Sequence, residues 1–256
     1  MAECLAEQLQ YPIVAREVIQ EAASDIGVSE EDLSRGFARA PTMWNRHASE
    51  RRLYIAAVQA ALAEHVVGGD LIYHGRAGQV LLAGLPGVLK VRLIAPISTR
   101  VRKLMESDEM DATAAEQYIR HVDGVRARWV KMMYGQDIED PVLYTMVINL
   151  KTMSVPSACA IVTRAAEQPD FAVTPEVKAK LVDFRLACRV KVALASARQT
   201  RSLDLEIAAH EGVIELSGTA PALSSGRMGE QIVGIARSVP DVEEVRLNVE
   251  WFDPYP

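Results

Sequence analysis

This 256-residue sequence lacks closely spaced cysteines, long apolar runs and an excess of positive charge. Its three cysteines, Cys4, Cys159 and Cys188, are widely separated and show no Cys-x-x-Cys spacing. This pattern predicts buried or incidental thiols in a reducing compartment, and neither a disulfide framework nor a metal site. The five histidines are also scattered, without the spacing of metal ligands.

No stretch contains the roughly 20 apolar residues that a membrane-spanning helix needs, and the first residues do not follow the pattern of a secretory signal. We therefore predict a soluble, cytoplasmic protein without a transmembrane segment. The formal charge of −6 argues against nucleic acid as a partner, because affinity for the phosphate backbone depends on a basic surface. Local basic clusters could still hold a small phosphorylated ligand.

Apolar residues make up 49% of the chain, which is enough to bury a sizeable core. In the first part of the sequence, the β-prone runs YPIV, LIYHG, VLKVRLIA and LYTMVIN alternate with segments of helical spacing. This alternation predicts an α/β fold with a parallel sheet covered by helices. One helix is predicted over residues 50–67, and another is expected to begin at Ser154 as its N-cap.

The composition changes over residues 165–175, where AAEQPDFAVTP carries two prolines and little periodicity. We place a linker over residues 166–175, between a domain of residues 1–165 and a second of residues 176–256. Beyond the linker the patterns predict a small α+β domain of order αββαβ. His210-Glu211-Gly212 is a plausible tight connection between its first two strands.

Four ordered motifs in residues 1–165 resemble the cytidylate-kinase-like family of P-loop nucleoside monophosphate kinases. They are YPIVAREVIQEAA, LIYHGRAGQVL, LPGVLKVRLIAP and YIRHVDGVRARWVKMMYGQDIEDPVLYTMVIN. The αββαβ unit, with VIELSGTAP and VPDVEEVRLNVE, is similar to a BON domain. The resemblance implies phosphoryl transfer from ATP, bound with Mg²⁺, to CMP or a similar nucleoside monophosphate. It also implies a small ligand or a phospholipid as partner of the BON-like domain.

The sequence contains no G-x-x-x-x-G-K-S/T loop, which in such kinases cradles the donor phosphates. The resemblance places this loop and the first strand upstream of Met1, and places that strand in the middle of the sheet, between LIYHG and VLKVRLIA. Two explanations stay open: the true start of the gene lies upstream and its assigned start is too late, or the protein has given up phosphoryl transfer and repaired its sheet.

As given, the chain is therefore expected to be impaired in phosphoryl transfer. A different interpretation is a non-catalytic, nucleotide- or lipid-sensing regulatory protein with a BON-like interaction domain. A third is a scaffold that self-associates through that domain.

By resemblance, the nucleoside monophosphate is bound at two places. Arg16 lies where the family carries Asp-Arg-Glu and would grip the monophosphate, although Ala15 replaces the usual acidic residue. Gly75 and Arg76 match the family's Gly-Arg after a strand, where a planar guanidinium suits a phosphate, and Gly78 keeps the turn permissive. An ordinary solvated arginine at a helix start is the alternative for Arg16.

Arg120, Asp123 and Arg126 follow one another at intervals of three and share a face of a predicted helix. In the family this segment is the lid, whose arginines neutralise charge on the transferred phosphoryl group. The resemblance makes Arg120, Arg126 and Arg128 the candidate catalytic cations, with Asp123 orienting them by bidentate pairing. Lys131 could belong to the same cluster. The alternative is an exposed helix with ordinary salt bridges.

Two further segments carry charged or polar patterns. The stretch from Asp137 to Asn149 matches the family pattern D-x-x-D-P-x-L-Y-x-x-V-I-N, and we interpret Asp140-Pro141 within it as a turn. Basic residues along the helix predicted over 176–199 could approach an anionic head group, or could form a solvated face. They are Lys178, Arg185, Arg189 and Lys191.

Overall fold

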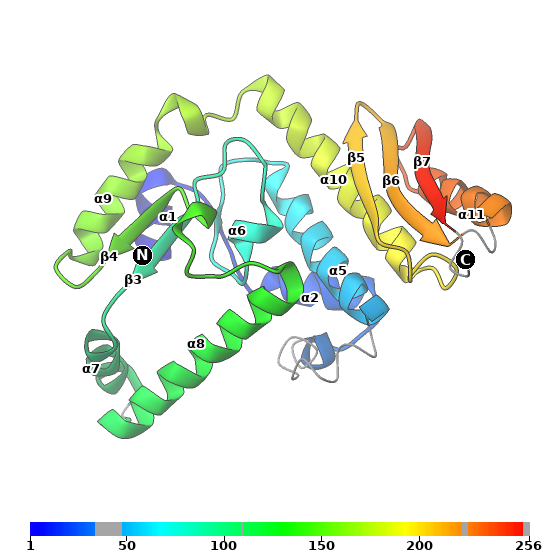
Figure 1. Ribbon diagram of the computed structural model, residues 1–256. Coiled ribbons are helices and arrows are strands. Elements are labelled where there is room, and N and C mark those ends of the chain that lie inside the picture. The colour runs from blue at the N-terminus through cyan, green and yellow to red at the C-terminus, as the bar shows by residue number, and fades with distance from the viewer. Residues whose placement is uncertain (34–47, 109, 222–224, 253–256) are drawn as a thin grey trace. The chain divides into compact units, whose positions relative to one another are not determined.

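The computed structural model describes residues 1–33, 48–108, 110–221 and 225–252 (Figure 1). The chain divides into two compact units: the first comprises residues 1–13 and 72–172, and the second comprises residues 14–71 and 173–256. Residues 14–71 thus group with the C-terminal part of the chain, whereas the predicted division into 1–165, 166–175 and 176–256 follows chain order and stays a prediction. None of the described helices combines the length and the apolar character needed to cross a membrane.

The first unit contains five helices and three strands among its described residues, and β1 (Ile13–Val14) stands where the chain passes into the second unit. The helices are α1 (Ala2–Leu9), α6 (Gly78–Leu81), α7 (Ile97–Asp108), α8 (Ala112–Tyr134) and α9 (Val155–Ala166). The strands are β2 (Ile72–Tyr73), β3 (Val91–Ile94) and β4 (Met146–Asn149), and the 3-10 turns are η1 (Pro141–Leu143) and η2 (Pro169–Phe171).

Strands β3 and β4 are parallel, with Val91 opposite Met146 and Ile94 opposite Asn149, which confirms the predicted parallel pairing for these two strands. Strands β1 and β2 form a separate two-stranded sheet. All four β-prone runs of the first part of the sequence are therefore strands. Within the described ranges, no strand pairs with both β2 and β3, so the expected single sheet is present as two pairs.

Helices α1 and α9 cover these strands through a small apolar core. Leu5, Ile148 and Val162 are buried together, and Ile72 and Val91 pack against them. Helix α9 begins where the sequence predicts: the Ser154 hydroxyl accepts the Ser157 N–H at 3.2 Å. Both strand pairs thus contribute to one core.

Cys4 on α1 and Cys159 on α9 form a disulfide in this core. The prediction of unpaired thiols is wrong for these two cysteines. Their separation of 155 residues gives no local signal, and the packing of α1 on α9 brings their Cα atoms to 6.4 Å. Cys188 is free and buried, as predicted, and burial raises the pKa of its thiol to about 12.

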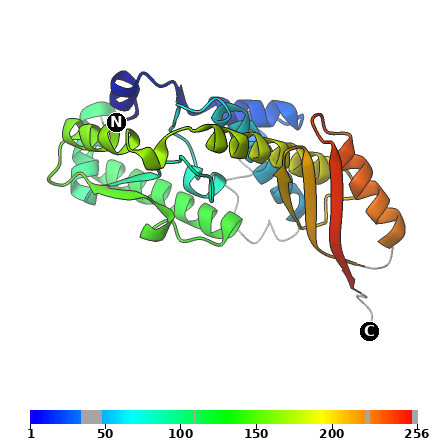
Figure 2. The same cartoon turned by 90° about the horizontal axis from the view of Figure 1, so that it is seen from above.

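The second unit combines helices from both parts of the sequence with a three-stranded sheet (Figures 1 and 2). Strand β5 is antiparallel to β6, β6 is parallel to β7, and the predicted αββαβ order is confirmed. Leu186, Ile214 and Ile232 place α10, the sheet and α11 in one core. The elements are α2 (Glu17–Asp25), α5 (Ala48–Val66), α10 (Pro175–Ser196), β5 (Leu205–His210), β6 (Val213–Pro221), α11 (Ser225–Arg237) and β7 (Glu244–Phe252).

A two-residue turn joins β5 to β6. Glu211 and Gly212 have φ values of 48° and 82°. Positive φ at both central residues is the requirement of a type I′ hairpin turn, whose twist matches that of the flanking strands. The predicted tight connection at this position is confirmed.

Basic residues of α10 contact acidic and polar residues of the same unit. The Arg189 guanidinium donates to both carboxylate oxygens of Glu64 on α5, at 2.6 and 3.0 Å, and lies 3.3 Å from Asp241. The Lys191 ammonium donates to the Gln59 side chain at 3.2 Å. These two cations therefore join helices and loops of the protein, which weakens the case for an anionic head group on this part of α10.

Candidate functional site

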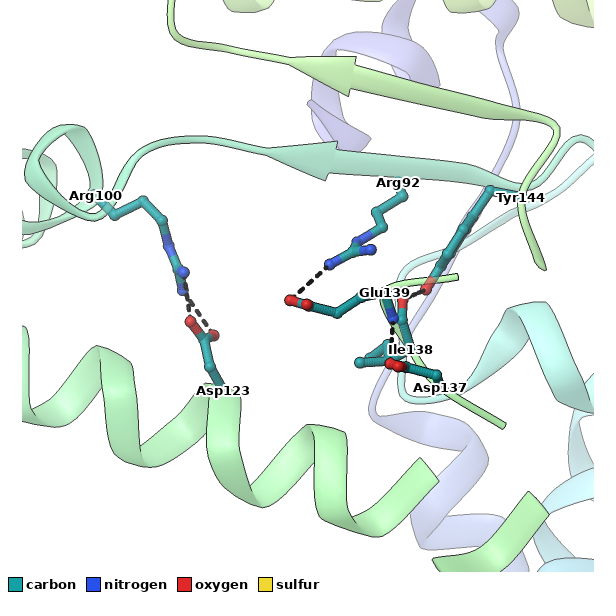
Figure 3. Close-up of polar contacts among 7 residues, drawn as sticks. All are labelled: Arg92, Arg100, Asp123, Asp137, Ile138, Glu139 and Tyr144. Carbon is teal, nitrogen blue, oxygen red and sulfur yellow. Dashed lines mark hydrogen bonds and ion pairs between the residues drawn. The ribbon is translucent and has the colours of Figure 1, made fainter. Parts of the chain in front are cut away.

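Charged side chains from separate segments of the first unit gather near Asp123 and Tyr144 (Figure 3). Arg92 lies on β3, Arg100 on α7 and Asp123 on α8. Helix α8 is fixed at its start by the Asp111 carboxylate, which accepts the Ala114 N–H at 2.9 Å. The site is thus built on regular elements and on the loop before β4.

Arg100 and Asp123 form a bidentate ion pair between α7 and α8. The Arg100 Nη1 and Nη2 atoms donate to the two carboxylate oxygens at 2.5 and 2.8 Å. The hydrogen bond from Arg100 holds the pKa of Asp123 below its usual range, and the charges of Arg126 and Arg92 act in the same direction. Asp123 therefore carries a negative charge that one arginine fully engages.

Arg92 is held more loosely. Its Cζ atom lies 5.6 Å from the centroid of the Tyr144 ring, within cation–π range. Its Nη2 atom is 3.6 Å from the Glu139 carboxylate, which is too long for a hydrogen bond. The Arg92 side chain is 23% exposed and that of Glu139 is 79% exposed. This carboxylate is accordingly free to leave the guanidinium.

The loop that carries Glu139 and Tyr144 is ordered by its own hydrogen bonds. The Asp137 carboxylate accepts the Glu139 N–H at 2.9 Å, and the Tyr144 hydroxyl donates to the Ile138 carbonyl at 2.8 Å. Burial raises the pKa of Tyr144, against the opposing charges of Arg92 and Arg126. Tyr144 thus remains a neutral phenol whose ring position is set by the loop.

The lid residues expected from the sequence all lie on α8 but differ in their surroundings. Arg120 pairs with Glu116 one turn earlier, at 2.6 Å, as an exposed helix pair. Asp123 has Arg100 as its partner, and not Arg120 or Arg126 as expected. The difference arises because α7 brings a guanidinium from another segment against α8, which the spacing along α8 does not show.

Arg126 and Arg128 are both exposed on α8. The positive charge of Arg126 acts to lower the pKa values of Asp123 and Tyr144, so this charge lies near the cluster. No carboxylate of the described residues lies within hydrogen-bonding distance of Arg126. Of the predicted lid cations, Arg126 is therefore the one whose charge acts on this cluster and that has no carboxylate partner among the described residues.

Gly75 and Gly78 enclose the ring of Tyr73. A Cβ atom on Gly75 would collide with that ring, and one on Gly78 would lie 2.7 Å from its Cδ1 atom. The Tyr73 hydroxyl donates to the Arg76 carbonyl at 3.2 Å, and burial raises the pKa of Tyr73 to about 12. The glycines are thus required by close packing, while the Arg76 side chain is exposed above this turn.

Arg16 belongs to the second unit, directly before α2. Its Nε atom donates to the Glu30 carboxylate at 2.7 Å, and this bond lowers the pKa of Glu30. The Arg16 side chain is 75% exposed. It therefore has an acidic neighbour of its own, as a solvated arginine at a helix start would.

Arg92, Arg100 and Glu139 were not identified from the sequence. Arg92 interrupts the apolar run VLKVRLIA, and a charged residue within such a strand was the available signal. Arg100 and Glu139 stand in polar segments where charged residues are ordinary. Their roles depend on contacts between segments that are distant in the sequence.

Residues 1–152 match the cytidylate kinase-like family, and the match includes every residue of the cluster. The chain belongs to the cytidylate kinase-like family. The family region ends just before α9, so the αββαβ part lies outside it.

Two individual proteins are similar to this family member. A cytidylate kinase of Staphylothermus marinus is 25% identical over 153 residues, which cover 59% of this chain and 78% of that protein. The crystal structure of an uncharacterized protein from Eubacterium ventriosum has a TM-score of 0.50 at 15% identity. That similarity covers 65% of this chain and 89% of the other, and it concerns the fold alone.

Proposed function

We propose that this protein binds a nucleoside monophosphate, such as CMP, at the arginine cluster of the first unit. In a complete phosphoryl-transfer site, an oxygen of the bound monophosphate forms the new bond to the terminal phosphorus of ATP. The bond from that phosphorus to the bridging oxygen breaks, which leaves ADP and a nucleoside diphosphate. Membership of the cytidylate kinase-like family supports this reaction class.

One observation carries the proposal: Asp123 is fully engaged by Arg100, while Arg126 on the same helix has no carboxylate partner among the described residues. A phosphate monoester carries up to two negative charges near neutral pH and offers several acceptor oxygens, which suit a guanidinium fork. Arg126 would bind these oxygens directly. Arg100 and Asp123 would hold α7 and α8 together beneath it.

The donor half of the reaction has less support in this chain. The sequence has no G-x-x-x-x-G-K-S/T loop, and the described residues contain no group of three or more side chains suited to a metal ion. Mg²⁺ would arrive with ATP. Because the sequence lacks the loop that cradles ATP phosphates, we expect this chain to bind the acceptor and to transfer phosphoryl groups poorly.

A regulatory role is the second candidate, and the absence of that loop favours it. The protein would then sense a nucleoside monophosphate without transferring phosphoryl groups, and its BON-like αββαβ part would serve interaction with another molecule. We propose a cytoplasmic location for the protein, whether it is an enzyme or a sensor. A disulfide such as that between Cys4 and Cys159 is uncommon in the cytoplasm.

Isothermal titration of the 256-residue protein with CMP, UMP, AMP and ATP–Mg²⁺ tests the proposal. We expect a monophosphate to bind, and Arg126→Gln to weaken that binding about 10- to 100-fold, as the loss of a charge-assisted hydrogen bond implies. Arg102→Gln removes an exposed arginine of α7 and is the matched control. The proposal fails if no monophosphate binds the wild-type protein, or if both variants behave alike. ATP–Mg²⁺ binding comparable to that of the acceptor would favour the enzyme over the sensor.

A further inference from the structure

Arg92 differs from the other arginines of the cluster because it projects from the sheet. Side chains alternate along a strand, and Val91 packs into the core beneath β3. Arg92 therefore points to the opposite face, where Figure 3 shows it directed toward Glu139 with Tyr144 beside it. Its charge also contributes to the lowered pKa of Asp123, as does that of Arg126.

We infer that Arg92 is a second anion-binding residue of this site, and that the Glu139 carboxylate occupies it until a phosphate monoester displaces that carboxylate. This inference rests on the proposed function and adds a residue and a competing internal anion to it. Glu139 would thus act as a weak, built-in competitor of the ligand.

The geometry of Glu139 fits displacement better than a permanent ion pair. The 3.6 Å separation and the 79% exposure of its side chain make this a weak pair that water screens. The backbone of Glu139 is already fixed by Asp137, so only the side chain has to move. A phosphate dianion has more charge and more acceptor oxygens than the carboxylate, which gives it the advantage at Arg92.

Tyr144 prepares Arg92 for this role. The ring supports the guanidinium from one side at a cation–π distance, and the hydrogen bond to the Ile138 carbonyl keeps the ring in place. An arginine held in this way loses less side-chain entropy when it binds an anion.

Titration of the full chain with CMP, cytidine and inorganic phosphate separates these roles. We expect Glu139→Gln to tighten CMP binding about two- to fivefold, the range set by a weak surface pair. We expect Arg92→Gln to weaken CMP binding about tenfold, and Glu139→Gln to have no further effect once Arg92 is changed. Cytidine, which lacks the phosphate, should respond to neither change. Tightening by Glu139→Gln should extend to inorganic phosphate if the phosphate alone is recognised.

Two controls show whether a loss of affinity in Arg92→Gln comes from misfolding: the Arg92→Lys variant, and thermal melting of Arg92→Gln. The lysine variant keeps the charge and should recover part of the affinity. The inference is overturned if Glu139→Gln leaves CMP affinity unchanged, or if it tightens CMP binding equally with and without Arg92. It is also overturned if Arg126→Gln abolishes binding while Arg92→Gln matches the Arg102→Gln control; in that case the proposed function still stands. If the wild-type protein binds no CMP, both proposals fail.

Discussion

The two units of this protein use arginine in opposite ways. In the second unit, Arg189 is bonded to Glu64 and lies close to Asp241, so its charge joins α10 to α5 and to a loop. In the first unit, the charge of Arg126 acts on Asp123, and Arg126 has no carboxylate partner of its own among the described residues. Both residues stand in basic helical segments of the sequence. The comparison teaches that the partner, and not the basic pattern, separates a structural arginine from a candidate binding arginine.

The units also differ in how their cores are held. The core around Ile148 includes a disulfide between α1 and α9, whereas the core around Ile214 is apolar throughout. Reduction of the disulfide should therefore destabilise the first unit by about 2–4 kcal/mol, because the bond closes a loop of most of the chain. Urea unfolding followed separately for the two units, with and without a phosphine reductant, measures this. A Cys4→Ser/Cys159→Ser protein should not respond to the reductant, and an equal shift in both units would contradict the comparison.

Substitution of a closely packed glycine should have the next largest effect on stability. Gly75→Ala would place a methyl group against the Tyr73 ring and should cost about 1–3 kcal/mol of stability through overpacking. Gly234→Ala, on an exposed site of α11 with no atom within 4 Å, should be neutral or slightly stabilising. Thermal melting of both variants checks this. If Gly75→Ala is as stable as the wild type, this glycine is not needed for packing. Contact with the substrate would then be the remaining role for it.

The ion pair of Arg189 with Glu64 should contribute to the stability of the second unit. Arg189→Gln should lower the free energy of unfolding by about 1 kcal/mol, a modest value because the pair is partly exposed to water. Arg198→Gln, an exposed change beyond the end of α10, is the matched control and should have no measurable effect. Equal midpoints of urea unfolding for the two variants would show that the Arg189 pair contributes nothing to this unit.

The smallest expected effect is a pH dependence of the stability of the first unit. Arg100 lowers the pKa of Asp123 in the folded protein, so the pair stabilises the fold fully above the ordinary aspartate value of 3.8. This contribution should disappear as the pH falls below that value, through the lowered pKa of the folded state. Acid unfolding of the wild-type protein and of Asp123→Asn measures it. A steeper loss of stability in Asp123→Asn than in the wild type would contradict this assignment.

Local signals in the sequence were sufficient for much of the fold. Ser154 as an N-cap, the helix over most of residues 50–67, and the Glu211-Gly212 turn were predicted because each depends on neighbouring residues. The Cys4–Cys159 disulfide was not, since it depends on the packing of α1 on α9. Sequence order alone also did not indicate that residues 14–71 group with the C-terminal part.

The candidate site was predicted only in part, for a similar reason. Helical spacing placed Asp123 and Arg126 on one helix, and the family resemblance marked that helix as the lid. The spacing could not show that Arg100 would take both oxygens of Asp123, or that Arg92 would reach the site from a strand. These contacts join different elements, so they follow from the tertiary fold.

The most direct test of the account is a CMP titration of Arg126→Gln beside Arg189→Gln. The account predicts a loss of about tenfold or more in CMP affinity for Arg126→Gln. It predicts an affinity equal to that of the wild type for Arg189→Gln, whose effect should be confined to stability. Equal affinities for the two variants, or a loss confined to Arg189→Gln, would contradict the account.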